Sequence, residues 1–457
     1  MDHLDPTPLR IQARDTDNGV LLLVDDRPFR IEYPEGLWGE TPPSIRQTLV
    51  ESLAFGNTHF LPLMLGKSKI DYDFGLPIFE SHLFKNQLYD LPSCEKADGA
   101  EPLSYLKRFF NLDLTFKNTP GALPDFSQIP RFTSEPPTAI LPFTFGKESL
   151  ATFALCQELG IRPILMYSQE PAHPHEEEYK VKQLKNFSQE FNVPAYFIQN
   201  EPGLFRYGKA FGLKESTEVG WGSQTTLLAL MALPLVFRHG ARHILFGSEF
   251  LNNEFELRNG WKSHNSFDQS SFWTRQQSNM MRLMTRGQCT VQSSLEPIEE
   301  INIFHLLHHR YPAIGKYQFS CSGEHPLYNG TQWCHACYKC VRMYLFALCC
   351  DIDPASIGFQ KNLLEREDLF SHYFGTEFKT GALQDLDFAF YALLKKGIDS
   401  PLVKRFKAEK LPHLKPWEWY RSYYSSLQPE ENLPPAHRDR LLSIFREEIR
   451  AFGDLLP

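Results

Sequence analysis

Four of the nine cysteines are clustered in a pattern that can bind a metal ion. Cys321, Cys334, Cys337 and Cys340 lie in the segment CSGEHPLYNGTQWCHACYKC, with the spacing C-x12-C-x2-C-x2-C. Four thiolates at this spacing suit tetrahedral Zn²⁺, with three sulfurs in a compact knuckle and a fourth that closes the site. An iron–sulfur cluster is the main alternative, because C-x2-C-x2-C also occurs in ferredoxin-type sites. The pattern predicts a metal site and leaves the metal open.

The residues next to these cysteines are expected to have other roles. Cys349 and Cys350 end an apparent helix, VRMYLFALCC, so we expect them to pack in the core. His335 lies inside the knuckle, and we expect it to be exposed rather than to bind the metal.

A second group of residues, TFGKES at 144–149, could bind phosphate. The segment follows the apolar run TAILPF and precedes the helical segment SLATFALCQEL. It is not a Walker A loop, because Leu141 and Glu148 occupy the positions of that motif's first glycine and of its Ser/Thr. Any phosphate binding must therefore use another arrangement.

A turn from a strand into a helix offers such an arrangement. It leaves backbone N–H groups unpaired at the positive end of the helix dipole. Gly146 would let an oxyanion approach these groups, and Lys147 and Ser149 would add a charge and a hydroxyl donor. An ordinary capped helix, with Thr144 or Ser149 near the cap, explains the same residues equally well.

A polar stretch at 247–273 follows the apolar run RHILFGS. Its carboxylates could bind Mg²⁺ or move protons, and its amides could orient a polar substrate. A hydrophilic surface loop is the alternative. The candidate residues are Glu249, Asn252, Asn253, Glu254, His264, Asn265, Asp268 and Gln269.

The elements around these motifs predict a doubly wound α/β fold with a mainly parallel sheet. TAILPF, the 144–149 turn, a helix that stops at Gly160 and the apolar run RPILMYS form a predicted βαβ unit. Further strands are expected at 193–199 and 242–248, with one helix, TTLLALMALPLVFRHG, between them. Ligands of such sheets bind beyond the carboxyl ends of the strands, where the turn would lie.

Changes in composition divide the chain into three predicted parts. The run VLLLVDDRPFRIE at 20–32 predicts a hairpin that opens an N-terminal α/β domain over 1–135. Five prolines at 117–138 indicate a linker or a long surface connection before a domain at 136–350 that carries the turn and the knuckle. Leu, Phe, Lys and Glu at helical spacing predict a helical C-terminal region over 351–457.

The composition is typical of a globular protein. Of the 457 residues, 42% are hydrophobic and 22% charged, and no window approaches the roughly 18 apolar residues of a membrane span. The N-terminal sequence MDHLDP lacks the features of a signal peptide, so we expect a cytoplasmic location, where clustered cysteines indicate metal binding rather than disulfides. A net charge of −8 without a long basic run makes a nucleic-acid partner unexpected.

A strand–TFGKES–helix turn followed by a four-cysteine knuckle resembles the PP-loop (N-type) ATP pyrophosphatase superfamily, over about residues 138–350. The most similar branch is the 7-cyano-7-deazaguanine synthase group, which has a four-cysteine zinc site at a similar spacing. In size and in its extra N-terminal region the chain is also similar to UDP-N-acetylmuramoyl-L-alanyl-L-glutamate epimerase. FGSEFLNNEFE (246–256) and SHNSFDQSSFW (263–273) loosely match that enzyme's polar segments.

The resemblance implies specific site residues. ATP and Mg²⁺ are the implied cofactors, together with a structural Zn²⁺ on the four cysteines. Lys147 would hold the departing pyrophosphate, and Glu249 or His264 would move a proton. Two residues depart from the family loop Ser-Gly-Gly-x-Asp-Ser, since Phe145 replaces its first glycine and Glu148 its aspartate. The phosphate-binding turn falls on Thr144, Gly146, Lys147, Glu148 and Ser149.

The implied activity is adenylation of a small-molecule carboxylate with release of pyrophosphate, followed by attack of ammonia, an amine or a base. The alternatives are epimerisation of a terminal glutamate, tRNA modification and a non-catalytic interaction module. The negative net charge disfavours tRNA, whereas Phe145 and Glu148 keep the non-catalytic alternative open. A homodimer or a protein substrate also stays open.

Overall fold

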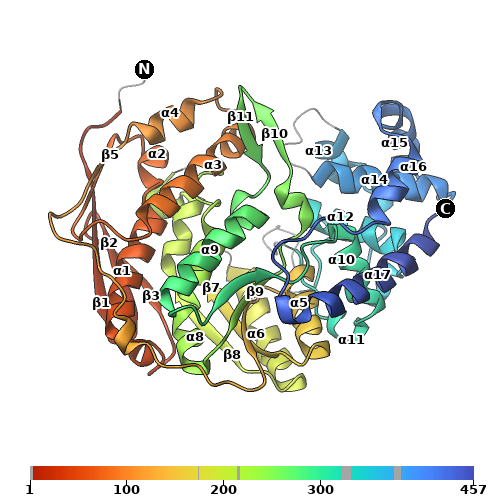
Figure 1. Cartoon of the computed structure of the whole chain (residues 1–457). Coiled ribbons are helices and arrows are strands. Elements are labelled where there is room, and N and C mark those ends of the chain that lie inside the picture. Colours follow the sequence, from red (N-terminus) through yellow and green to blue (C-terminus); the bar gives the residue numbers. More distant parts are fainter. Residues whose placement is uncertain (1–3, 173, 214–216, 322–330, 375–381) are drawn as a thin grey trace.

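One mostly parallel sheet of ten strands organises the chain. The structure is a computed structural model that describes residues 4–172, 174–213, 217–321, 331–374 and 382–457 (Figure 1). The expected α/β fold is confirmed at this level. The strand order is β12 (Thr290–Ser293), β9 (His243–Phe246), β6 (Thr138–Pro142), β7 (Arg162–Gln169), β8 (Ala195–Asn200), β3 (Arg27–Glu32), β2 (Gly19–Val24), β1 (Leu9–Thr16), β4 (Lys69–Tyr72) and β5 (Asp113–Thr115).

The five strands from β12 to β8 pair in parallel. The chain runs from β6 outward through β7 to β8, then returns to the other side of β6 to form β9 and β12. The order therefore reverses between β6 and β9. In open α/β sheets ligands bind at such a switch point, beyond the carboxyl ends of the two strands.

The predicted N-terminal hairpin is confirmed. β2 and β3 pair in antiparallel register, and Asp25 and Asp26 turn the chain with φ angles of 45° and 66°. β3 also pairs in antiparallel register with β8, so strands from both sides of residue 135 share one sheet. The division at 135 and 350 stays a prediction.

Alternate residues of the central strands enter two hydrophobic cores, one on each face of the sheet. On β6, Ile140 belongs to one core, whereas Ala139 and Leu141 belong to the other. The first core includes α1 (Pro43–Thr58), α3 (Glu80–Asp98), α7 (Gln224–Met231), α8 (Leu233–His239) and α9 (Ser271–Met284). The second includes α5 (Lys147–Glu158), α6 (Pro174–Glu190), α10 (Glu300–His309), α11 (Pro312–Gly315) and α12 (Tyr338–Cys349).

The single helix predicted at 225–240 is wrong, because the chain forms α7 and α8 with Ala232 between them. Pro234 lies in the first turn of α8. Proline has no N–H to donate within a helix, but it suits the first turn, where that donor has no partner. The apolar periodicity continues across the break, so the pattern alone does not reveal it.

The helical C-terminal region is confirmed. Figure 1 shows its helices on the side of the molecule opposite the N-terminal strands. A second hairpin, β10 (Phe255–Arg258) with β11 (Trp261–His264), lies between them. None of the described helices is long and apolar enough to cross a membrane. The C-terminal helices are α13 (Ser371–Phe374), α14 (Ala382–Lys395), α15 (Pro401–Glu409), α16 (Trp417–Tyr424) and α17 (Arg438–Leu455).

Candidate functional site

The 144–149 turn lies at the switch point and opens α5. Gly146 is the N-cap residue and has no side chain that could cap the helix. The Ser149 hydroxyl instead donates to the Gly146 carbonyl at 3.1 Å and accepts from the Thr144 N–H at 3.3 Å. The Glu148 carboxylate also lies at this first turn, where a hydrogen bond from its own backbone N–H helps to lower its pKa. An anion at the N-terminus of α5 would therefore share the free N–H groups of the helix with Glu148.

Phe145 anchors the turn in the core. It has a left-handed backbone, with φ 61°, and its side chain is fully buried. Its ring packs edge-on against Phe143 and Phe187, with centroids 4.9 and 5.7 Å away. The Phe319 N–H donates to its carbonyl at 2.8 Å. A left-handed non-glycine residue costs about 1–2 kcal/mol, which burial of the ring offsets. Phe145 thus fixes the turn by burying its ring.

Lys147 lies at the centre of a buried charge network. Its ammonium pairs with Glu148 and with Glu300, the latter at 2.5 Å. The other carboxylate oxygen of Glu300 pairs with Arg342. The side chains of Lys147, Glu300 and Arg342 are only 4%, 6% and 16% exposed. Two cations are therefore held beside the N-terminus of α5, on both sides of one carboxylate.

These residues line a cavity of about 270 Å³. A second cavity of about 140 Å³ lies beyond the carboxyl ends of β6 and β7 and shares Thr144, Glu176 and Lys180 with the first. Small-molecule sites typically occupy roughly 300–1,000 Å³, so the two together suit a ligand longer than a single phosphate. The first cavity is lined by Thr144, Gly146, Lys147, Glu148, Glu176, Lys180, Glu300, Phe319, Ser320, Cys321, Tyr338, Lys339, Arg342 and Met343.

The segment after β9 forms the other side of the switch point. A Cβ atom on Gly247 would lie 2.7 Å from the Glu148 Cβ and 2.9 Å from its carbonyl oxygen, so only glycine allows this approach. Glu249 follows two residues later. Burial raises its pKa to about 7, against the opposing charge of Lys147. One Glu249 oxygen is buried without a hydrogen-bond partner among the described residues.

Neighbouring carboxylates ionise differently. Burial tends to raise the pKa of Glu148, but its pairing with Lys147 outweighs burial, and the pKa lies below the ordinary value. Burial raises the pKa of Asp385, and the charge of Arg342 opposes the increase. The pairing with Lys147 therefore favours the ionised form of Glu148, whereas burial favours the protonated form of Glu249.

The four predicted cysteines converge. Their ligand atoms all lie within 4.8 Å of one another. The Sγ atoms of Cys321 and Cys337 are 3.9 Å apart, those of Cys334 and Cys340 3.8 Å, and those of Cys337 and Cys340 3.5 Å. A tetrahedral ion with bonds of about 2.3 Å to sulfur requires separations of about 3.8 Å. The cluster could therefore hold one metal ion.

Other expectations near the knuckle have mixed outcomes. Cys349 and Cys350 are buried in the core, as predicted. The expected exposure of His335 is wrong, since its residue is only 5% exposed and its Nε2 accepts from the Gln360 N–H at 2.9 Å. This bond satisfies the imidazole without a metal. Residues 322–330, inside the cysteine segment, lie outside the described part of the chain.

The cysteine knuckle also lines the first cavity, the one around Lys147. Cys337 is the N-cap residue of α12, and Tyr338, Lys339 and Arg342 from its first turns line the cavity. Cys321 lines it as well. A metal bound to the cysteines would therefore fix the helix that presents Arg342 to Glu300.

A third cavity, of about 950 Å³, lies among α3, the β10–β11 hairpin and the C-terminal helices. Predicted His264 lines this cavity and not the one around Lys147. Its ring packs near Phe255 and Phe267, with centroids 5.4 and 5.2 Å away. The cavity meets the other two at shared residues, Tyr338 with the first and Gln224 with the second.

Most polar residues predicted at 247–273 have structural partners as well. The Asp268 carboxylate accepts from the Thr225 N–H at 2.9 Å, and burial raises its pKa to about 7. Asn253 accepts from the Ser271 N–H at 2.7 Å. Glu254, Asn265, Asp268 and Gln269 line the third cavity. Asn252 is buried.

No protein-family model matches this chain, and no curated protein matches its sequence. The sequence predictions found Lys147 and the cysteines but missed Glu300, Arg342 and Lys180. Arg342 is separated from Cys340 by one residue. A helix predicted to begin after Cys337 would have placed Arg342 about one turn from its start. Glu300 begins a helix after β12, a strand that the apolar pattern did not reveal.

Proposed function

We propose that the protein is a PP-loop-type ATP pyrophosphatase that activates a substrate carboxylate as an acyl-adenylate. The observation that carries the proposal is the N-terminus of α5, which lies at the switch point with Gly146 as its N-cap residue and buried Lys147 beside it. Backbone N–H groups at a helix N-terminus and a fixed ammonium together favour polyphosphate over a neutral ligand.

The charges around this cavity suit transfer of AMP. A carboxylate oxygen of the substrate attacks the α-phosphorus of ATP, and the bond from that phosphorus to the β-phosphate oxygen breaks. Pyrophosphate leaves with the electron pair. Lys147 and Arg342 lie where they would stabilise the growing negative charge, and Lys180 and Lys339 line the same cavity. Such preorganised cations lower the barrier most when water is excluded.

Mg²⁺ would neutralise the phosphates of the bound nucleotide. This ion is usually held by one or two carboxylates together with substrate phosphates. Glu148 and Glu249 are the carboxylates at the switch point that fit this requirement. Glu148 is 37% exposed and keeps its charge, and Glu249 has a buried oxygen without a partner among the described residues.

We propose zinc for the four-cysteine site, in a structural role. Sulfur separations of 3.5–3.9 Å suit one tetrahedral ion, whereas the thiolates of an iron–sulfur cubane bind different iron atoms and lie farther apart. All four positions are protein thiolates, as in closed structural sites. The ion would hold α12 in place. Loss of the ion would therefore weaken the cavity around Lys147 indirectly, because α12 supplies Arg342 to it.

The third cavity suits the rest of the substrate. The lining of this cavity is mainly acidic. Its single lysine, Lys96, pairs with Glu256 at 2.9 Å. Burial raises the pKa of Asp90 and Asp387 to about 6. Carboxyl groups of this kind accept hydrogen bonds from N–H groups, as on the guanine-like edge of a 7-deazaguanine. The substrate would place its N–H groups here and its carboxylate toward Lys147. The acids are Asp90, Glu218, Glu254, Glu256, Asp268 and Asp387.

Glu249 is the stronger candidate for the base that follows adenylation. A base is most effective when its pKa lies near the working pH, and burial raises the pKa of Glu249 to about 7. It lies near Lys147, whose charge acts on it. His264 lines only the third cavity, so it would contact the far part of the substrate.

Equilibrium binding of labelled ATP tests the phosphate site. Wild-type protein with Mg²⁺ should bind ATP, and Lys147→Ala should weaken binding by at least about 10-fold, since a buried charge-assisted contact contributes roughly 1.5–3 kcal/mol. Lys67→Ala removes a lysine that pairs with Asp5 at 3.0 Å elsewhere, and should bind ATP normally. Equal binding by both variants, or none by the wild type, would contradict the proposal.

A further inference from the structure

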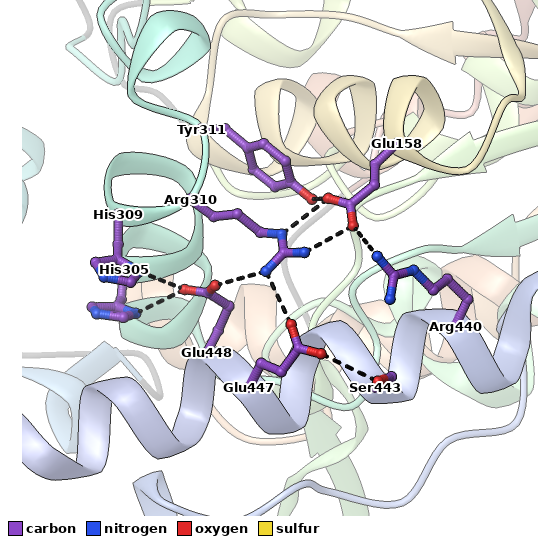
Figure 2. Close-up of polar contacts among 9 residues, drawn as sticks. All are labelled: Glu158, His305, His309, Arg310, Tyr311, Arg440, Ser443, Glu447 and Glu448. Carbon is purple, nitrogen blue, oxygen red and sulfur yellow. Dashed lines mark hydrogen bonds and ion pairs between the residues drawn. The ribbon is translucent and has the colours of Figure 1, made fainter.

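A second group of metal-binding side chains lies between α10 and α17. His305 and His309 are one helical turn apart on α10, and Glu448 faces them from α17 (Figure 2). Their ligand atoms all lie within 4.8 Å of one another. Residues at i and i+4 share a helix face, and paired histidines at this spacing are a recurrent metal-binding arrangement.

The separations match the requirements of one ion. The Nδ1 atoms of His305 and His309 lie 3.7 and 2.9 Å from the same oxygen, Oε2 of Glu448. A tetrahedral ion with bonds of about 2.0–2.2 Å to nitrogen and oxygen requires ligand separations of about 3.3 Å. The observed values lie on either side of this distance, so small side-chain adjustments would complete the site.

His305 provides an independent indication that a ligand is needed. Its side chain is 1% exposed, and both ring nitrogens are buried without a hydrogen-bond partner among the residues that the structure describes. The 3.7 Å separation from Glu448 is too long for a hydrogen bond. Leaving a buried polar group unsatisfied costs about 1–3 kcal/mol, and a metal bond would satisfy the Nδ1 atom.

The carboxylate of Glu448 is already oriented for this role. Its Oε1 accepts from Arg310 at 3.2 Å, while its Oε2 faces the histidines (Figure 2). Arg310 is itself held by two bonds to Glu158 at the end of α5, of 2.9 and 2.8 Å. Such supporting hydrogen bonds typically orient metal ligands in proteins. Arg310 would keep its bond to Oε1 when Oε2 binds a metal.

We propose that His305, His309 and Glu448 form a second metal site for a divalent transition ion of the zinc class. Two imidazoles and one carboxylate are a ligand set typical of Zn²⁺. His309 is 54% exposed, so water can reach the site and supply a fourth ligand. The ion would join α17, near the C-terminus, to α10, whose first residue is the Glu300 that pairs with Lys147.

Metal titration of the full chain, stripped by a chelator, tests the site. Wild-type protein should take up one more Zn²⁺ or Co²⁺ per chain than the cysteines bind. The added Co²⁺ should give ligand-field bands without the thiolate charge-transfer bands of the cysteine site. Glu448→Gln and His309→Ala should weaken this second binding by at least about 10-fold, the lower limit for loss of even a supporting partner.

Glu447→Gln is the matched control. Glu447 is the neighbouring glutamate on α17 and also pairs with Arg310 at 3.2 Å, but it is not among the three ligands. This variant should bind the second ion normally, and Cys337→Ser should keep it while losing the thiolate-bound ion. His309 is exposed, so its variant remains informative if Glu448→Gln folds poorly. Metal bound by the cysteines alone, or equal second-ion binding by His309→Ala and wild type, would overturn the proposal.

Discussion

The buried pairing of Lys147, Glu300 and Arg342 makes a sharp prediction about stability. Glu300→Gln keeps the size of the side chain but removes the charge between the two cations. Lys147 keeps its ion pair with Glu148 in this variant. Arg342, which is 16% exposed, loses its ion pair with Glu300. Breaking a buried ion pair costs about 3–5 kcal/mol. Because Lys147 keeps one partner, we expect a loss near the lower end, about 3 kcal/mol in the free energy of unfolding.

Glu148→Gln is the matched comparison. It removes the other carboxylate that pairs with Lys147, but this side chain is 37% exposed. A pair with one partly exposed partner is screened by water, so its loss should cost less than the loss of the buried Glu300 carboxylate. Urea unfolding of the two variants, followed by circular dichroism, should therefore give clearly unequal losses. Equal losses would refute the assignment of Glu300 as the buried centre of the network.

Three further predictions concern the metal, the backbone and pH. Cys337→Ser should lose the proposed zinc, measured by elemental analysis, and should melt at a lower temperature. A structural zinc contributes on the order of 10 kcal/mol to folding. Cys350→Ser should keep the metal, because Cys350 is not one of the four clustered cysteines. Gly247→Ala should weaken ATP binding, because its Cβ would lie 2.9 Å from the Glu148 carbonyl oxygen. Gly39→Ala should bind ATP normally, since a Cβ there would have no atom within 4 Å. Equal ATP binding by the two variants would contradict the role of Gly247. Burial raises the pKa of Glu249 from 4.5 to about 7, so the folded state binds more protons than the unfolded chain in this window. Glu249 should thus lower the free energy of unfolding as pH rises from about 4.5 to 7. The difference in this free energy between wild type and Glu249→Gln should change in that direction over the window, whereas Glu256→Gln should follow the wild type, and a constant difference for Glu249→Gln would contradict the assignment.

The local elements of the fold could be predicted because each depends on nearby residues. The β6–α5–β7 unit follows from two apolar runs, a helical segment and Gly160, whose φ of 68° ends the helix region. The β2–β3 hairpin follows from its Asp-Asp turn. The break between α7 and α8 was missed because the apolar periodicity masked the effect of Pro234.

The sites were predictable to different degrees for a physical reason. The cysteines lie close together in sequence, so spacing alone indicated their convergence. Lys147 meets Glu300 across 153 positions, a contact that only the packing of α10 against α5 creates. Likewise, the spacing of His305 and His309 places them on one helix face, but Glu448 joins them from a helix far along the chain. Spacing reveals ligands on one element and gives no information on those that tertiary packing adds.

The position at which ATP is cleaved tests the proposed function most directly. ATP labelled on the α- and γ-phosphates would be incubated with Mg²⁺, the protein and a panel of carboxylates that includes 7-deazaguanine acids and glutamyl compounds. Wild-type protein should release AMP and pyrophosphate with at least one of them, and Lys147→Ala should not. Release of ADP and phosphate, or no cleavage with any carboxylate, would contradict the proposal.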